Sequence, residues 1–214
     1  MIEHLDLGSV VPVAHDASGP PAIGWSLAHP GRVSALVLLN TYYCAMKTLR
    51  PPEAILLYST PILRNIARMV VGRYDLLDRK LYAWQVGRFV RDPVVRSEVV
   101  PLLYSRFLES RPAFWSLNAD LLRTVRSRTR MIPQMRAFER PVRVVFGADD
   151  PYLNAGMAGR FHELFPDSDK FLLDGARHYV QVDEPDEVSR LILSATSADA
   201  PVPDDRRYPH WRYD

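Results

Sequence analysis

Residues 10–20 read Val-Val-Pro-Val-Ala-His-Asp-Ala-Ser-Gly-Pro, a short β-branched run that stops abruptly at small and reactive side chains. This order predicts a buried strand that turns sharply into a helix, with Asp16 at the apex of the turn. Ala14, Ser18 and Gly19 are small, as such a turn requires where backbone segments approach closely. A carboxylate at the apex, in place of Ser or Cys, favours attack on carbon to give an alkyl ester.

Length and composition indicate one globular domain, or a domain with a lid. The chain has 214 residues, of which 47% are hydrophobic and 24% charged, and its net charge of +2 gives no strong field toward nucleic acid. No apolar run approaches the ~20 residues that span a bilayer, and the N-terminus lacks a signal-peptide pattern. With Cys44 as its one cysteine, the chain is expected in a reducing compartment, and we expect a cytoplasmic protein.

Apolar patterns at both ends of the chain predict an α/β fold. Short parallel strands are expected over 10–13, 33–39, 142–146 and 170–173. Helices are expected between and after them, over 20–28, 157–165 and 184–195. Residues 2–7 resemble the last turn of a helix that stops at Gly8.

The middle of the chain changes character and reads as an all-helical insertion. Apolar residues recur at three- and four-residue spacings, and prolines divide the segment into several short helices. Between Tyr42 and Arg140 there are 18 Lys and Arg against 8 Asp and Glu, which indicates either a solvated helix surface or a lid that attracts anions. We expect a core formed by 1–41 and 139–197, a helical cap over 42–138, and a disordered tail over 198–214.

Three polar residues, Asp16, Asp150 and His178, each follow the carboxyl end of a predicted parallel strand. Open α/β sheets place their sites at that edge. The plain alternatives are a helix N-cap for Asp16 and an ordinary loop position for His178, while Asp149 competes with Asp150 because Asp-Asp-Pro turns are common in loops. The remaining histidines show no metal-ligand pattern and are expected to pack or to face solvent; they include His15, His29 and His162.

Three motifs in this order resemble the α/β-hydrolase family over residues 1–197: Ala14-His15-Asp16-Ala17-Ser18-Gly19, Phe146-Gly147-Ala148-Asp149-Asp150-Pro151 and Gly175-Ala176-Arg177-His178-Tyr179-Val180-Gln181. The resemblance implies a partial parallel sheet of about four strands with an inserted helical cap. It also implies a triad in the order nucleophile, acid, histidine. The third position after Gly147 matches the family's acid, which favours Asp150 over Asp149.

Within that family, a chain with an aspartate as nucleophile resembles the epoxide hydrolase and haloalkane dehalogenase branch. The resemblance implies that Asp16 opens an epoxide or expels a halide, and that His178 activates the water that hydrolyses the ester. Asp150 then orients the imidazole, and the backbone N–H of Ala17 is one oxyanion donor. No metal or organic cofactor is implied. The expected partner is a small apolar epoxide, and neither nucleic acid nor a membrane.

The sequence departs from this branch just after the apex. Dehalogenases of this type carry a halide-binding tryptophan at the position of Ala17, so its absence favours epoxide opening, although Trp84 or Trp115 of the cap are alternative halide donors. Epoxide hydrolases use cap tyrosines to donate to the epoxide oxygen. The sequence leaves this role open among three tyrosines, Tyr74, Tyr82 and Tyr104.

A second departure concerns the strands that the family normally has ahead of the apex, one of which supplies another oxyanion donor. We therefore expect a chain that is N-terminally truncated relative to the family. Its strand near Val10 would be an unprotected edge, through which a homo-oligomer can form. The rival functions are carbon–halogen hydrolysis, an inactive remnant that binds a ligand or partner, and a serine-type esterase relative, against which Asp16 argues.

Overall fold

A computed structural model describes residues 2, 4–71 and 73–195 of the chain. Its centre is a parallel sheet with the strand order β1-β2-β3-β4, so that β1 and β4 are the outer strands. The strands are β1 (Val13–Asp16), β2 (Leu36–Thr41), β3 (Val142–Gly147) and β4 (Ser168–Leu173). The predicted four-stranded parallel sheet surrounded by helices is confirmed, while the expected tail over 198–214 lies outside the described residues.

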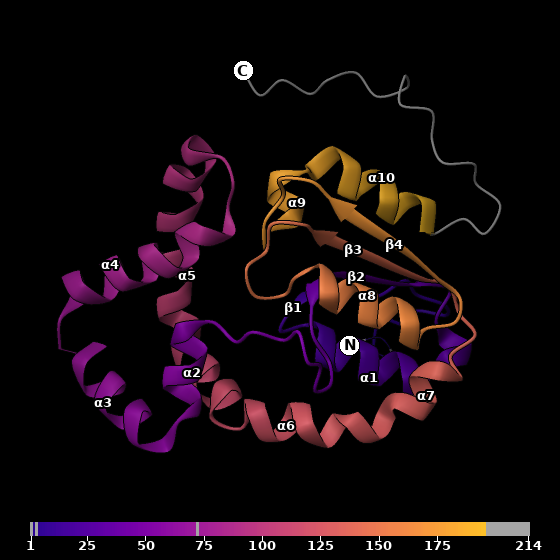
Figure 1. Ribbon diagram of the computed structural model, residues 1–214, viewed down its shortest axis with the longest axis horizontal. Helices are drawn as coiled ribbons and strands as arrows, with labels where there is room; N and C mark the ends of the chain where they lie inside the picture. Colours follow the sequence, from indigo (N-terminus) through magenta and orange to yellow (C-terminus); the bar gives the residue numbers. More distant parts are fainter. Residues whose placement is uncertain (1, 3, 72, 196–214) are drawn as a thin grey trace.

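Helices cover both faces of the sheet, because alternate side chains of a strand point to opposite faces. Leu36 and Leu38 belong to a core cluster with side chains of two helices on one face, and Val37 and Leu39 pack against two helices on the other. The first two helices are α1 (Gly19–Ala28) and α8 (Ala155–Leu164), and the other two are α9 (Val180–Asp183) and α10 (Pro185–Ala195). Figure 1 shows α1 and α8 on one side of the sheet and α9 and α10 on the other.

The first two strands begin later than the sequence predicts. Val10 and Val33 pair only through an isolated bridge, and Pro12, which has no N–H to donate, separates that bridge from the continuous ladder. Residues 4–6 form turns and not the expected end of a helix. Leu5 and Leu7 there are exposed, so no buried apolar face holds a helix in place.

The cap is helical throughout its described elements, as predicted. The expectation that its prolines divide it into short helices is wrong at Pro101 and Pro112, which both lie inside the 27-residue helix α5. That helix continues because buried side chains such as Tyr104 pack it against its neighbours. The cap helices are α2 (Glu53–Ser59), α3 (Pro61–Val71), α4 (Asp75–Val86), α5 (Pro93–Ala119), α6 (Leu121–Ser127) and α7 (Ile132–Arg136).

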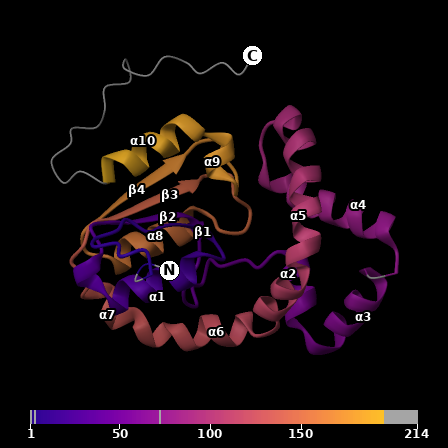
Figure 2. The ribbon, with the colours of Figure 1, turned by 180° about the vertical axis from the view of Figure 1, so that it is seen from behind.

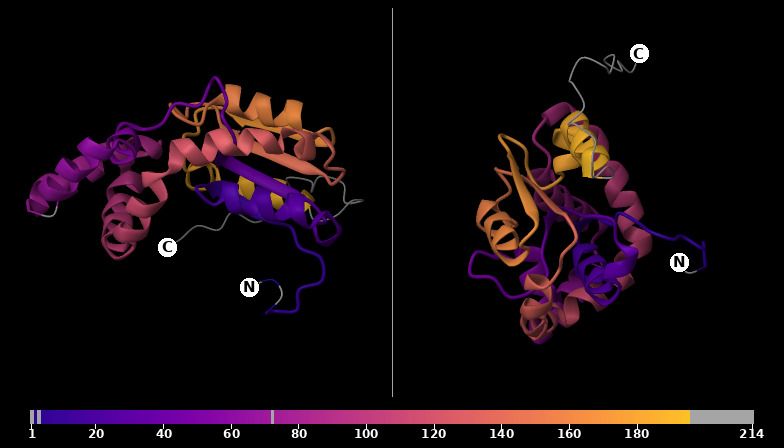
Figure 3. Two further views of the ribbon diagram at one scale, coloured as in Figure 1. Left: turned by 90° about the horizontal axis from the view of Figure 1, so that it is seen from below. Right: turned by 90° about the vertical axis from the view of Figure 1, so that its right-hand side faces the viewer.

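The cap consists of an outer part and a returning part. Seen from behind in Figure 2, and from two further sides in Figure 3, α2 to α5 form an arm beside the sheet, and α6 and α7 lead back along the core. Val125 of α6 and Met135 of α7 are buried in the same cluster as the sheet residues Leu36 and Leu38. The returning part is therefore anchored to the core. No helix in the described part of the chain is long and apolar enough to cross a membrane.

Candidate active site

Asp16 lies at the apex of the turn that joins β1 to α1, which is the sharp turn that the sequence predicts. Its φ is 47°, in the left-handed region that few side chains other than Asn and Asp adopt readily. Thr41, at the end of the neighbouring strand, donates its hydroxyl to the Asp16 carbonyl oxygen at 2.5 Å. The Ser18 hydroxyl accepts from the His15 backbone N–H at 2.8 Å. These bonds hold a strained residue with its carboxylate outside the sheet.

Gly19 makes the close approach of α1 to β2 feasible. A Cβ atom built at this position would lie 1.8 Å from Thr41 Oγ1, far inside van der Waals contact. A small residue is therefore required at position 19 for a steric reason. Gly19 leaves room for Thr41, which bonds to Asp16 at the apex.

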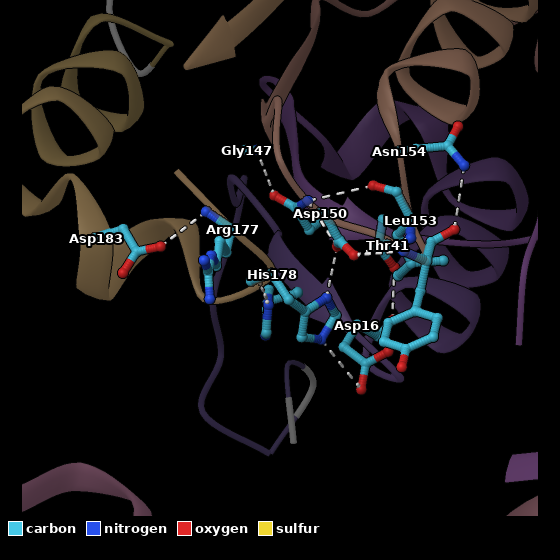
Figure 4. A network of polar contacts seen from close by, with 12 residues as sticks. Asp16, Thr41, Gly147, Asp150, Leu153, Asn154, Arg177, His178 and Asp183 are labelled. Carbon is cyan, nitrogen blue, oxygen red and sulfur yellow. Dashed lines mark hydrogen bonds and ion pairs between the residues drawn. The ribbon is translucent and has the colours of Figure 1, made fainter. Parts of the chain in front are cut away.

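The structure brings the three predicted site residues together. His178 Nδ1 lies 2.8 Å from Asp150 Oδ2, and Nε2 lies 3.9 Å from Asp16 Oδ2 (Figure 4). With Nδ1–H donating to Asp150, the lone pair of Nε2 faces the space beside the Asp16 carboxylate. Asp149 is exposed, whereas Asp150 is buried beside the histidine, so geometry favours Asp150 as the partner.

Asp150 accepts a full set of hydrogen bonds. Its Oδ1 accepts from the backbone N–H groups of Tyr152 at 2.8 Å and Leu153 at 3.1 Å. Its Oδ2 accepts from Asn40 Nδ2 at 2.9 Å and from His178. A carboxylate with four donors is fixed in orientation and stabilised in its charged form. The sequence did not indicate Asn40, because its partners lie more than 100 residues away.

Opposing effects set the protonation of the pair. Burial alone raises the pKa of Asp150, but the hydrogen bond and charge of His178 and the backbone donors outweigh burial, so its pKa lies below the ordinary 3.8. Burial alone lowers the pKa of His178, but Asp150 and the charge of Asp16 raise it above the ordinary 6.5. The imidazole therefore becomes a neutral base only at a pH above that ordinary value.

His15, which directly precedes Asp16, contacts His178 through both its ring nitrogen and its ring face. Its Nε2 lies 2.9 Å from the His178 carbonyl oxygen, and the two ring centroids are 4.8 Å apart. Burial and the charge of His178 lower the pKa of His15 to about 4. The ring is thus neutral near pH 7, where its Nε2–H donates to the carbonyl.

The loop that carries His178 is bonded both to α9 and to the cap. Asp183 of α9 accepts from the backbone N–H groups of Arg177 at 2.7 Å and Arg91 at 2.8 Å. The Tyr179 backbone N–H donates to the Phe89 carbonyl at 3.0 Å. Cap residues therefore help to fix the imidazole, which sequence patterns did not reveal.

A cavity of about 560 Å³ lies between the core and the cap. Asp16, Ala17 and His178 line its floor, and apolar and aromatic side chains of the cap form most of its walls. The ring of Phe89 packs against His178 with 4.7 Å between centroids. Within the described residues the backbone N–H of Ala17 has no hydrogen-bond partner, so it is free to bind an oxygen at the floor.

The structure separates the cap tyrosines that the sequence left open. Tyr82 lines the cavity, and burial raises its pKa to about 12, so it keeps its proton. Tyr104 does not line this cavity, and its hydroxyl donates to Asp78 at 2.8 Å. Tyr74 is 56% exposed and lies outside the lining. Of the three, Tyr82 is the one that borders the cavity.

The cap tryptophans also differ. Trp84 lines the cavity, under the guanidinium of Arg88 at 5.1 Å from the ring centroid. Trp115 is not among the lining residues and lies beneath Arg68 at 4.8 Å. Within the described residues, Trp84 is therefore the one tryptophan that borders the cavity.

Comparisons with known proteins agree with this architecture. A family model described as alpha/beta hydrolase fold matches residues 1–185, and no curated protein sequence matches the chain. The 2-hydroxy-6-oxo-6-phenylhexa-2,4-dienoate hydrolase from Rhodococcus sp. strain RHA1 superposes with a TM-score of 0.68 at 15% identity, over 91% of this chain and 66% of that one.

Two further solved structures are similar. A meta-cleavage product hydrolase from Pseudomonas fluorescens IP01 gives a TM-score of 0.68 at 17% identity, over 91% of this chain and 66% of that one. A thermophilic esterase from Thermogutta terrifontis gives 0.65 at 18% identity, over 90% and 66%. The chain thus spans about two thirds of the length of these structures, and at such identities the likeness shows the fold.

Proposed function

The chain belongs to the alpha/beta hydrolase fold family, and from this premise we propose that it hydrolyses apolar epoxides through an alkyl ester on Asp16. One observation carries the proposal. A carboxylate at the apex of a strained turn lies 3.9 Å from an imidazole whose other nitrogen is 2.8 Å from a buried carboxylate. A carboxylate nucleophile gives an ester that water can hydrolyse, and the imidazole is the base that hydrolysis needs.

In the first step an oxygen of Asp16 attacks an epoxide carbon. A carbon–oxygen ester bond forms as the ring carbon–oxygen bond breaks, and the electron pair stays on the former epoxide oxygen. Tyr82 gives that oxygen its phenolic proton. This step consumes no water and requires no base.

In the second step His178 takes a proton from water, whose oxygen adds to the carbonyl carbon of the ester. The Ala17 N–H stabilises the oxyanion, and Asp150 stabilises the imidazolium. Collapse releases the diol oxygen, which takes the proton of the imidazolium. Asp16 then loses the remaining water proton, which restores the phenol of Tyr82.

The cavity bears on the size and polarity of the substrate. A volume of about 560 Å³ is within the range of sites for drug-sized ligands, and its walls are mainly apolar. It therefore suits an epoxide that carries an aryl or alkyl group better than the smallest epoxides. Carbon–halogen hydrolysis is the alternative, in which the indole N–H of Trp84, a cavity-lining residue, would bind the halide.

The test is a trapped intermediate. His178→Gln is incubated with styrene oxide or, separately, with a 1-bromoalkane, and the peptide that holds Asp16 is analysed by mass spectrometry. An adduct of the whole epoxide supports the proposal, and an alkyl adduct with bromide release from the haloalkane alone supports the alternative. No adduct with either class overturns both and leaves a binding protein. His162→Gln, an exposed histidine, is the control that should accumulate no ester.

A further inference from the structure

Asn40 is a polar side chain buried at the carboxyl end of β2. It is 0% exposed and stands among leucines in a strand that is otherwise apolar up to Thr41. Its φ is 24°, at the border of the left-handed region that asparagine tolerates. A buried amide in such a place needs partners for each of its polar atoms.

Asn40 has these partners on both sides of its amide. Its Nδ2 donates to Asp150 Oδ2 at 2.9 Å and to the Leu153 carbonyl at 3.3 Å. Its Oδ1 accepts from the Gly147 backbone N–H at 2.8 Å. The two acceptors and the donor fix which atom is nitrogen, because the flipped amide would oppose an N–H to an N–H. Asn40 thus clips the end of β2 to the loop that carries Asp150.

We propose that Asn40 is a positioning residue that aims the Asp150 carboxylate at His178 and thereby makes His178 an effective base. This inference rests on the proposed function, because it concerns the step in which His178 acts as the base that activates water. Asn40 is not among the residues that line the cavity, and its amide bonds to Asp150, Leu153 and Gly147 rather than to the imidazole. It acts through Asp150, whose Oδ2 it shares with His178, and through the Gly147 bond that fixes where the loop begins.

The two chemical steps depend on Asn40 differently. Formation of the ester by Asp16 needs no base, so it does not require an aligned Asp150. Hydrolysis of the ester requires the correct imidazole tautomer and orientation, which Asp150 supplies. Loss of the amide donor therefore slows the second step selectively.

The first experiment measures both steps with styrene oxide in single turnovers of the 214-residue chain. Asn40→Ala is expected to slow ester hydrolysis at least ~10-fold and to change ester formation less than ~3-fold, so that the ester accumulates. Ser194→Ala is the matched control, because Ser194 is a buried hydroxyl bonded to Leu191 on the opposite face of the sheet. Equal slowing of both steps, or the same pattern in Ser194→Ala, overturns the proposal.

Asn40→Asp provides a second test and keeps an acceptor for Gly147. Two carboxyl groups so close share one proton, which can replace the amide hydrogen toward Asp150. Hydrolysis is therefore expected to approach the wild-type rate at low pH and to fall away from it as the pH rises and the proton leaves. A profile parallel to that of the wild type overturns the proposal. This variant carries the test if Asn40→Ala does not fold.

A third measurement needs no substrate. The titratable groups that face His178 are Asp16 and Asp150 at its nitrogens and His15 and Tyr179 against its ring. All four remain in Asn40→Ala, so nuclear magnetic resonance titration of the imidazole isolates the effect of Asn40. We expect the pKa of His178 to fall toward its ordinary value as Asp150 loosens. An unchanged pKa in the folded variant overturns the proposal, whereas failure of the epoxide chemistry leaves this measurement intact.

Discussion

The hydroxyl of Thr41 donates to the carbonyl oxygen of Asp16 at 2.5 Å, which joins the end of β2 to the apex of the turn after β1. The bond bridges two neighbouring strands at the point where both leave the sheet. It exists because α1 begins with a glycine against Thr41. The geometry at the cavity floor thus depends on a residue that has no side chain.

Gly19→Ala is expected to lower the free energy of unfolding by about 1–3 kcal/mol, the cost of overpacking a close contact. The new methyl group displaces Thr41 and with it the bond to the apex. Urea unfolding measures the change. Gly31→Ala is the control, since a Cβ at Gly31 meets nothing within 4 Å; equal stability of the two variants would contradict the steric account.

Tyr82→Phe removes the phenolic donor that the proposed mechanism assigns to the epoxide oxygen. Because a positioned acid contributes about 10²–10⁴-fold, ester formation from styrene oxide should slow by at least ~100-fold while hydrolysis of the ester is unchanged. Rapid-quench mass spectrometry separates the two rates. Tyr74→Phe, at an exposed tyrosine outside the cavity, should leave both rates as they are. Normal ester formation in Tyr82→Phe would assign the proton to another group.

In the free enzyme the pKa of His178 should lie above 6.5, because Asp150 and the charge of Asp16 raise it against the opposite effect of burial. In the ester intermediate Asp16 carries no charge, so the rate of ester hydrolysis should rise with pH through a midpoint below the His178 pKa of the free enzyme. Asp150→Asn removes a further charge, so its midpoint should move down again. Nuclear magnetic resonance titration of the free enzyme and single-turnover rates between pH 5 and 9 provide the two measurements, with Asp149→Asn as the control. A hydrolysis midpoint above the His178 pKa of the free enzyme would refute the assignment.

The partly buried His15 should make the protein acid-sensitive. Its pKa is about 4 in the folded chain against 6.5 when unfolded, so the unfolded state binds the extra proton between these values. Stability should therefore fall as the pH drops from 6.5 to 4, by roughly 3 kcal/mol, and this loss should end below pH 4. Urea unfolding at a series of pH values tests it. His15→Gln should flatten the dependence, and His162→Gln, at an exposed histidine, should not.

The sequence was informative where function imposes a local pattern. Small residues around Asp16 predicted the turn, and strand ends predicted that Asp150 and His178 would meet it. It could not reveal Asn40, because a single polar residue at the end of an apolar strand has no local signature and its partners are distant in the chain. Long-range packing likewise decided that Tyr82 lines the cavity and Tyr104 does not, since the two tyrosines lie on different cap helices.

Strand and helix ends show the same limit. Val10 and Val33 have strand-like composition, yet Pro12 interrupts the hydrogen bonding, so the ladder begins later. Pro112 was expected to end a helix, but α5 continues through it because tertiary packing outweighs the lost bond. Composition predicts the type of element better than its ends, which depend on contacts with other elements.

The division of the cap into an arm and an anchored return has a consequence for engineering. Val125 of α6 and Met135 of α7 belong to the same buried cluster as the sheet residues. These two helices must therefore stay with the sheet in any chimera. The exchangeable module is the arm from α2 to α5. Swapping it between relatives would alter which molecules are admitted. Phe89 and Arg91 must be kept in the graft, because the Phe89 ring packs against His178 and the Arg91 guanidinium donates to the Asp183 carbonyl oxygen.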